Sequence, residues 1–156
     1  MGCKNRTRGF SLIELLIVVL IISILALVAI PMVETSVKRE KEIQLRRNLR
    51  TIITAIDEYR KFIIKNKIEH DEDTYGYPET LETLIDGIEY EDKQGEDRIQ
   101  KFLRKIPVDP MTNSYEWGLR SYQDKRDSTS WSGDNVYDVY TKSERKALDG
   151  TYYKGW

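Results

Sequence analysis

The sequence is poor in the residue types from which catalytic and metal sites are usually built. Its 156 residues include one cysteine, Cys3, and one histidine, His70. A single cysteine cannot form a disulfide within the chain, and the sequence has no glycine-rich phosphate loop and no H-x-x-x-H or G-x-S-x-G pattern. His70 lies among acidic residues without a second histidine or cysteine, which is more typical of a solvated loop than of a metal site. The composition therefore argues against an enzyme.

Charge is absent from one long stretch, since the 19 residues from Leu15 to Val33 carry no charged side chain. About 20 apolar residues in a helix cross the hydrocarbon core of a bilayer. The residues before this stretch include Lys4, Arg6 and Arg8 but no acid, so the positive-inside rule predicts a cytoplasmic N-terminus. We therefore expect one membrane-spanning helix with the rest of the chain on the far side of the membrane.

Residues 8–31 resemble the N-terminal signal of type IV pilins and type II secretion pseudopilins, because Gly9, Phe10, Glu14, the apolar run and Pro31 fall in the same register. The resemblance implies that a prepilin peptidase cuts between Gly9 and Phe10 and that the new amine of Phe10 is methylated. It also implies that Glu14 and Pro31 act in assembly, Glu14 by pairing with the Phe10 amine of a neighbouring subunit. A generic signal anchor fits the hydropathy equally well, but it requires none of these residues.

A second helical pattern follows the apolar run. Neither glycine nor proline occurs between Pro31 and Lys67, and apolar side chains recur there in steps of three and four. The residues of this stripe are Leu45, Leu49, Ile52, Ile56, Tyr59 and Ile63. We predict one helix from about Phe10 to Lys65, roughly 85 Å long at the standard rise. Charged residues such as Glu42 and Arg46 are expected on its solvent-exposed face.

The middle of the chain predicts short helices and a loop. Pro78 is expected to open a short helix that ends at Gly87. Residues 89–98 are strongly charged and predict a flexible insertion. Residues 99–106 contain apolar residues at helical spacing, which predicts one or two helical turns that stop at Pro107.

The last third predicts strands. The proline-aspartate-proline turn in residues 107–117 resembles the core of the major pseudopilins of type II secretion. Residues 117–122 and 135–141 favour strands, because they are rich in aromatic residues and valine and the second alternates. The predicted fold is therefore α+β and pilin-like. A long N-terminal helix, transmembrane in its first half and amphipathic in its second, packs on a small antiparallel β-sheet of two to four strands.

The C-terminal segment has two interpretations. Asp138, Ser143 and Asp149 occupy positions comparable to those of a calcium-binding loop in major pseudopilins, and calcium takes six to eight oxygen ligands. Three basic side chains also fall within this loop, and the residues after Gly150 depart from the family pattern. The alternative is a hairpin turn at Asp149–Gly150, with the following tyrosines and Trp156 covering the core.

These observations predict three parts: a leader that is removed, a transmembrane or filament-core helix, and a globular domain. Their boundaries are 1–9, 10–33 and 34–156, and the last part comprises the amphipathic helix 34–65, a loop region 66–106 and a β region 107–156. Without the leader the chain has 22 basic and 26 acidic side chains, a net charge of −4. That balance argues against nucleic acid as the main ligand.

The resemblance implies a non-enzymatic subunit of a type II secretion pseudopilus, a helical filament that drives protein export. Its expected partners are further copies of the chain, minor pseudopilins, the prepilin peptidase and an assembly platform in the inner membrane, with the globular domain in the periplasm. One alternative is a type IV pilus subunit for adhesion, motility or DNA uptake. Many such pilins hold their C-terminal region with a disulfide, which this chain cannot make. A further alternative is a binding module on a signal anchor.

Overall fold

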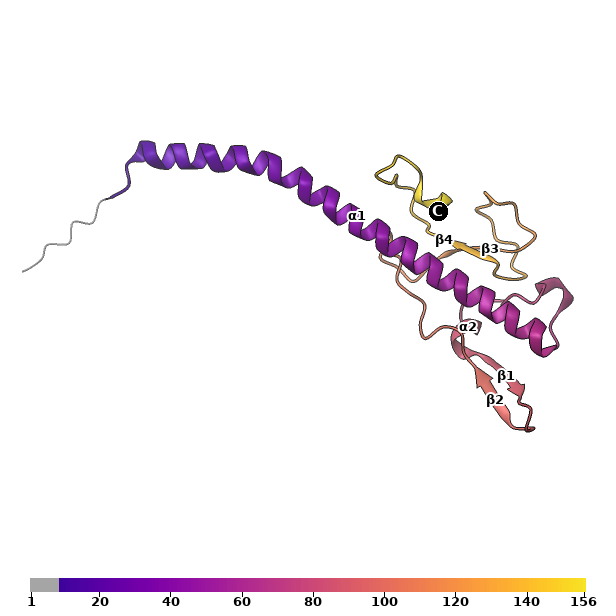
Figure 1. Ribbon diagram of the computed structural model, residues 1–156. Helices are drawn as coiled ribbons and strands as arrows, with labels where there is room; N and C mark the ends of the chain where they lie inside the picture. The colour runs from indigo at the N-terminus through magenta and orange to yellow at the C-terminus, as the bar shows by residue number, and fades with distance from the viewer. Residues whose placement is uncertain (1–8) are drawn as a thin grey trace, which may run out of the picture. The chain divides into compact units, whose positions relative to one another are not determined.

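The computed structural model describes residues 9–156, apart from the side chains of Val28 and Pro31. Its elements are α1 (Leu12–Asn66), η1 (Glu72–Thr74), α2 (Thr83–Asp86), β1 (Ile88–Glu91), β2 (Asp97–Gln100), β3 (Gly118–Arg120), β4 (Asp138–Tyr140) and η2 (Tyr153–Gly155) (Figure 1). The chain forms two compact units that divide between Lys38 and Arg39, and α1 runs through both. The prediction of one long N-terminal helix is confirmed.

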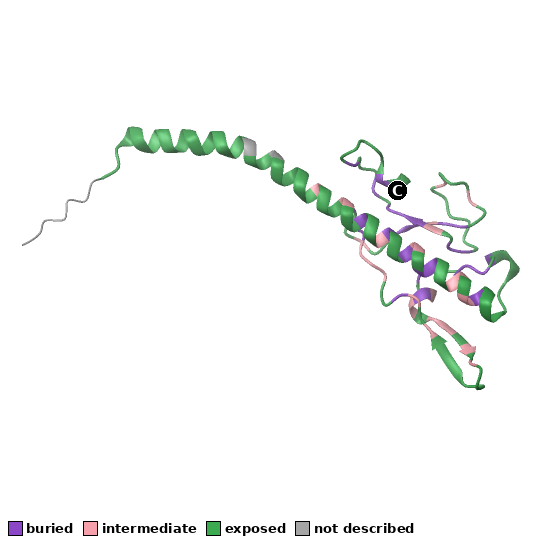
Figure 2. Ribbon diagram, viewed as in Figure 1, coloured by how far each residue is buried: buried purple, intermediate pink, exposed green. Residues whose placement is uncertain are grey.

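The C-terminal half of α1 supplies one wall of the hydrophobic core. Of the predicted stripe, Leu45, Leu49, Ile52, Ile56 and Ile63 are buried, and Tyr59 packs against them half-buried. Figure 2 shows buried residues along one side of this half of the helix. Val136 and Val139, from the β4 region, and Trp117 are among the other members of the core cluster. Burial of this one stripe therefore positions the whole C-terminal unit.

Four short strands form two separate antiparallel pairs. β1 pairs with β2, and β3 pairs with β4 in the register Gly118↔Tyr140, Leu119↔Val139 and Arg120↔Asp138. The predicted α+β class is confirmed. The predicted single sheet is instead divided, because the β1–β2 pair contacts the helix elsewhere than the β3–β4 pair.

Residues 89–98 are not the flexible insertion that their charge predicted. They form the β1–β2 hairpin, which packs on α1 through the edge-to-face contact of Tyr90 with Phe62, with ring centroids 5.0 Å apart. Its turn is ordered by Asp92, whose carboxylate accepts hydrogen bonds from the amides of Gln94 and Glu96 at 2.8 and 3.1 Å. Charged residues here lie on the exposed faces of a two-stranded ribbon, so composition alone misreads them.

Residues 99–106 are also not helical. The amides of Phe102 and Leu103 both donate to the carbonyl of Leu84, at 3.0 and 2.9 Å, which fastens this segment to α2 and leaves no helical ladder. The short helix predicted to open at Pro78 begins only at Thr83, and it ends before Gly87 as predicted. Gly87 has φ +88°, a conformation that favours glycine.

The turn after Pro107 is fixed by a fully buried carboxylate. Asp109 accepts hydrogen bonds from the Met111 amide at 2.8 Å, from the Thr112 hydroxyl at 3.0 Å and from the Thr141 hydroxyl. On the helix side, the Asn48 side chain donates to the carbonyl of Val108 at 2.8 Å. A buried charge is tolerated only when it is hydrogen-bonded in this way. The proline-aspartate-proline turn therefore connects α1 to the end of β4.

The β3–β4 pair leaves no room for a side chain at Gly118. A Cβ added there would lie 2.3–2.6 Å from the ring of Tyr140. We expect Gly118→Ala to lower the free energy of unfolding by about 1–3 kcal/mol, the usual effect of overpacking a core. Chemical denaturation of the purified chain measures this, with Gly155→Ala as the control because a Cβ at Gly155 meets nothing within 4 Å. Equal stability of the two variants would contradict the packing argument.

Candidate assembly site

A side-chain cap fixes the start of α1. Ser11 precedes the helix, and the amide of Glu14 donates to the Ser11 hydroxyl at 3.2 Å. The spacing of a serine followed three residues later by glutamate is that of a capping box, in which both side chains satisfy free amides of the first turn. This role of Ser11 was missing from the sequence analysis, although the spacing itself was visible. Glu14 thus lies in the first turn, where the helix dipole favours an anion.

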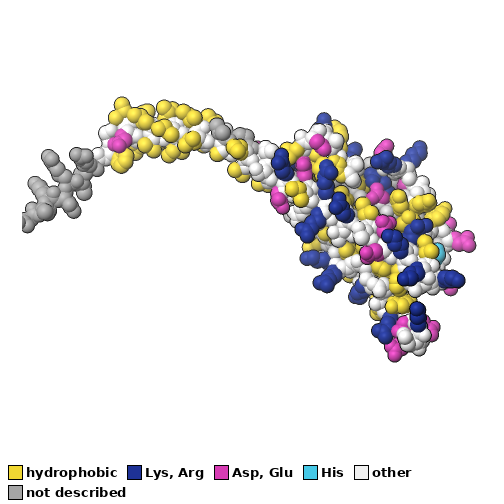
Figure 3. Space-filling view, in the orientation of Figure 1, with side chains coloured by type: hydrophobic (Ala, Val, Ile, Leu, Met, Phe, Trp, Pro, Cys, Tyr) yellow, Lys and Arg dark blue, Asp and Glu magenta, His cyan; other side chains and the backbone are white. Residues whose placement is uncertain are grey.

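The N-terminal unit exposes an apolar surface on every side of the helix. Its large side chains from Leu12 to Val33 are between 44% and 84% exposed wherever they are described. On the face seen in Figure 3 the described part of this helix is mainly hydrophobic, whereas the C-terminal unit carries many charged side chains. Within the described residues, α1 is the one helix long and apolar enough to cross a membrane. Such an area of apolar surface marks a site that lipid or other protein must cover.

Two serine hydroxyls of α1 are satisfied by carbonyls of the helix itself. The Ser23 hydroxyl donates to the carbonyl of Val19 at 2.8 Å, and the Ser36 hydroxyl donates to the carbonyl of Met32 at 2.9 Å. In lipid, an unsatisfied polar group is costly because no water replaces the missing partner. The helix can therefore exchange lipid for protein neighbours without losing hydrogen bonds.

The predicted processing residues precede the helix. Gly9 and Phe10 lie outside α1, Phe10 is 75% exposed, and a Cβ at Gly9 would meet nothing within 4 Å. The bond between them is therefore accessible to a peptidase. The predicted assembly residue Pro31 lies within the bounds of α1, but its side chain is outside the described residues.

The structure does not bring the three predicted calcium ligands together. Asp138 forms an ion pair with Arg120 at 3.0 Å, the Ser143 hydroxyl accepts from the guanidinium of Arg145 at 3.3 Å, and Asp149 is exposed. Among the residues that the structure describes, no group of three or more His, Cys, Asp or Glu is arranged to hold a metal ion. Calcium binding stays a prediction.

The hairpin alternative has direct geometric support. Lys146 and Tyr152 form an antiparallel bridge, and the intervening Gly150 has φ +86°. The segment packs on α1 through Tyr153, which is 1% exposed and donates its hydroxyl hydrogen to Glu42 Oε1 at 2.8 Å. The prediction that Glu42 lies on the solvated face is therefore wrong. Glu42 is half-buried beneath the C-terminal segment, and its carboxylate accepts hydrogen bonds from Leu148 and Tyr153, which are more than 100 residues away in the sequence.

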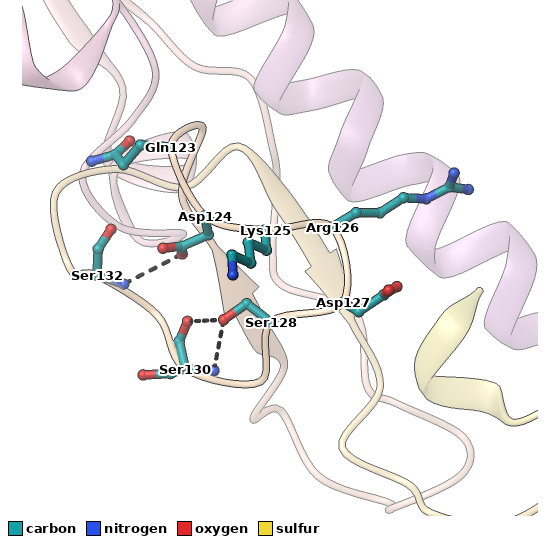
Figure 4. Close-up of a pocket in the computed structure, with 8 residues that line it drawn as sticks. All are labelled: Gln123, Asp124, Lys125, Arg126, Asp127, Ser128, Ser130 and Ser132. Atoms are coloured by element: carbon teal, nitrogen blue, oxygen red, sulfur yellow. Dashed lines mark hydrogen bonds between the residues drawn. The ribbon is translucent and has the colours of Figure 1, made fainter.

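A polar cavity of about 580 Å³ lies in the loop between β3 and β4 (Figure 4). Its lining residues are Gln123, Asp124, Lys125, Arg126, Asp127, Ser128, Ser130 and Ser132. The carboxylate of Asp124 accepts from the amide of Ser132 at 3.3 Å, and the Ser128 hydroxyl donates to the carbonyl of Ser130 at 2.6 Å. These hydrogen bonds order the loop, and no histidine lines the cavity to activate a serine.

Comparison with known proteins finds sequence similarity to pilus and pseudopilus subunits. A family profile described as the prokaryotic N-terminal methylation motif matches residues 4–30. The chain is 28% identical to the type II secretion system core protein G of Pseudomonas aeruginosa over 73% of this chain and 75% of that protein. It is 23% identical to the protein of the same name from Escherichia coli K12 over 74% of each.

A shorter match involves a pilin. Over 50 residues the chain is 50% identical to the type IV major pilin protein PilA of Myxococcus xanthus, which covers 32% of this chain and 23% of that protein. No solved structure matches the chain significantly. The comparisons support a pilin or pseudopilin assignment, and the resemblance inferred from the sequence is confirmed. These relatives are structural subunits and not enzymes, in agreement with the sequence analysis.

The contact between Tyr153 and Glu42 predicts a pH dependence of stability. The pKa of Tyr153 is raised to about 12, mainly by burial and then by the hydrogen bond to Glu42 and the charge of Glu42; the nearby charge of Arg145 partly opposes this rise, and that of Asp149 adds slightly to it. Well below pH 10 the phenol keeps its proton in both the folded and the unfolded chain, because the ordinary tyrosine pKa is 10.0. Between pH 10 and 12 the unfolded chain loses the proton first, so the stabilisation declines as the pH rises.

We therefore expect the stability difference between wild type and Tyr153→Phe to be largest below pH 10 and to shrink towards pH 12. Denaturant unfolding of both proteins across this range measures the difference. Other tyrosines and lysines titrate equally in both proteins, so they cancel from it. A difference that stays constant from pH 8 to pH 12 would contradict the role assigned to the Tyr153 proton.

Proposed function

We propose that the chain is a structural subunit of a type II secretion pseudopilus, which assembles through its N-terminal helix into a filament that drives protein export. The observation that carries this proposal is the uncovered apolar surface of residues 12–33, which the Gly9–Phe10 bond closely precedes and which carries Glu14 in its first turn. The similarity to two core G proteins over about three quarters of the chain favours a pseudopilus.

In this proposal the N-terminal helix has two successive environments. Before assembly it holds the chain in the inner membrane, with the N-terminus cytoplasmic and the C-terminal unit in the periplasm. After removal of residues 1–9, the apolar helices of many copies bundle in the filament core. Lipid is as apolar as leucine, so this exchange depends on close packing and on polar pairs between helices, not on hydrophobic transfer.

Glu14 supplies the polar pair. Cleavage creates one new positive charge, the amine of Phe10, and a staggered neighbour can present that amine to the Glu14 carboxylate. Attraction between the two charges strengthens as the local dielectric falls, so the pair forms best within the apolar bundle. Because both groups lie at fixed positions near the helix start, their pairing sets the register between subunits.

A type IV pilus subunit is the second candidate, favoured by the 50% identity to PilA over 50 residues. Deletion of the gene separates the two: a pseudopilus subunit is required for protein export, whereas a pilus subunit is required for surface fibres. A binding module on a signal anchor is the third candidate. It predicts that the purified processed chain stays monomeric in detergent and forms no filaments when it is overproduced in cells.

The processing step predicts a defined mature N-terminus. Assembled protein should begin at Phe10 and carry a methyl group on its amine, which mass spectrometry measures directly. Gly9→Val should leave the chain uncleaved and unassembled, because a branched side chain would occupy the cleavage position. Gly2→Val changes a glycine of the same leader and should be processed normally. Intact Met1 in assembled filaments would exclude this type of processing.

The proposed charge pair predicts a specific defect at Glu14. Glu14→Ala should insert and be cleaved normally, but its filament yield should fall strongly because the Phe10 amine loses its partner. Glu14→Gln separates this role from capping, since glutamine also completes a capping box but carries no charge. Filament yield by shearing and electron microscopy measures both variants, with Glu34→Ala as the control. Normal assembly of Glu14→Gln as the sole subunit would exclude the charge pair and leave capping.

A further inference from the structure

The end of the chain is fastened to α1 by two side chains one helical turn apart. Glu42 Oε1 accepts two hydrogen bonds, from the amide of Leu148 and from the hydroxyl of Tyr153, both at 2.8 Å. Four residues further along the helix, the Arg46 guanidinium lies 3.9 Å from the ring centroid of Trp156. The rings of Tyr153 and Trp156 contact each other edge to face, with centroids 5.1 Å apart. The two helix residues thus hold both ends of residues 148–156.

A third side chain, Arg145, holds the residues just before this segment. The guanidinium of Arg145 donates to the backbone carbonyl of Met111 and, through Nε, to the Ser143 hydroxyl at 3.3 Å. Carbonyl and hydroxyl oxygens of a folded loop are the ligands that calcium takes. In this structure the positive group that contacts these two oxygens is the guanidinium of Arg145 and not a metal ion.

The donor set around this loop does not fit a calcium ion. The carboxylate of Asp138 forms an ion pair with Arg120, which is itself buried. The carboxylate of Asp149 accepts from the amide and hydroxyl of Thr151, at 2.9 and 2.6 Å. Both predicted carboxylate ligands are therefore engaged, and Arg145 adds a positive charge that opposes a divalent cation.

We propose that three side chains form a clamp that orders residues 142–156 without a metal ion: Glu42 and Arg46 hold residues 148–156 on α1, and Arg145 ties the residues before them to Met111. The clamp holds the C-terminal segment in place of the calcium ion that Asp138, Ser143 and Asp149 were predicted to bind. It explains how a chain that cannot form an internal disulfide orders its last residues. Since Tyr153 is buried, removing its acceptor leaves a polar group without a partner inside the protein, which is more costly than losing an exposed contact.

The test uses the full chain in detergent and needs no filament assembly, so it is independent of the proposed function. Thermal unfolding is measured with millimolar calcium chloride and with a chelator, and trypsin digestion followed by mass spectrometry measures cleavage after Lys142, Lys146 and Lys154. Glu42→Ala is compared with Glu40→Ala, whose side chain is exposed one half-turn away. If Glu42→Ala does not fold, Tyr153→Phe replaces it, since it removes the same hydrogen bond and keeps the ring.

For wild type we expect the same melting temperature in calcium and in chelator, because binding only to the folded chain would otherwise raise it. We expect Glu42→Ala to accelerate cleavage in this segment about fivefold or more, which corresponds to about 1 kcal/mol of local stability. Two results would overturn the proposal. One is a calcium-dependent rise in the wild-type melting temperature; the other is a cleavage rate of Glu42→Ala equal to that of Glu40→Ala.

Discussion

A single helix with two kinds of surface is the constraint on which the rest of this structure depends. From Leu12 to Val33 its apolar side chains are exposed wherever they are described, and from Leu45 to Ile63 one stripe is buried. The first surface is left uncovered by the residues that the structure describes. The second surface is covered by the chain's own loops and strands. Because a helix satisfies its own backbone hydrogen bonds, the same element can serve in lipid, in a filament core and in a globular domain.

The C-terminal unit is small and its regular structure is sparse, so buried polar side chains organise much of it. Asn135 is fully buried, and its side chain accepts from the Tyr122 amide at 2.9 Å and donates to the Gln123 side chain at 3.0 Å. Asp109 has the same role on the other side of β4, where it joins the turn after Pro107 to Thr141. No buried side-chain N or O atom in the described part of the chain lacks a hydrogen-bond partner. Fully satisfied polar networks of this kind specify one arrangement of loops.

Regions where sequence reasoning failed are those in which a contact distant in the chain overrides local preference. The charged residues 89–98 form a hairpin because Tyr90 packs on Phe62 and because the adjacent Gly87 lets the strands approach closely. Residues 99–106 have helical spacing, yet the amides of Phe102 and Leu103 donate to the carbonyl of Leu84 and not to carbonyls of their own segment. In both segments local composition predicted the wrong structure, because the stability of a short helix or strand comes mainly from tertiary packing.

The sequence by itself determined the long helix, the division of that helix into an apolar and an amphipathic half, the buried stripe and the α+β class. These follow from periodicity and from the absence of charge, glycine and proline, which act over neighbouring residues. It also predicts that Gly9 and Phe10 flank the processing site and that Glu14 acts in assembly, because these predictions depend on spacing along the chain. Only the tertiary structure decided that Glu42 and Arg46 contact the C-terminal segment, since their partners lie more than 100 residues away. Long-range pairing of this kind depends on how the loops close over the helix, and no local pattern encodes it.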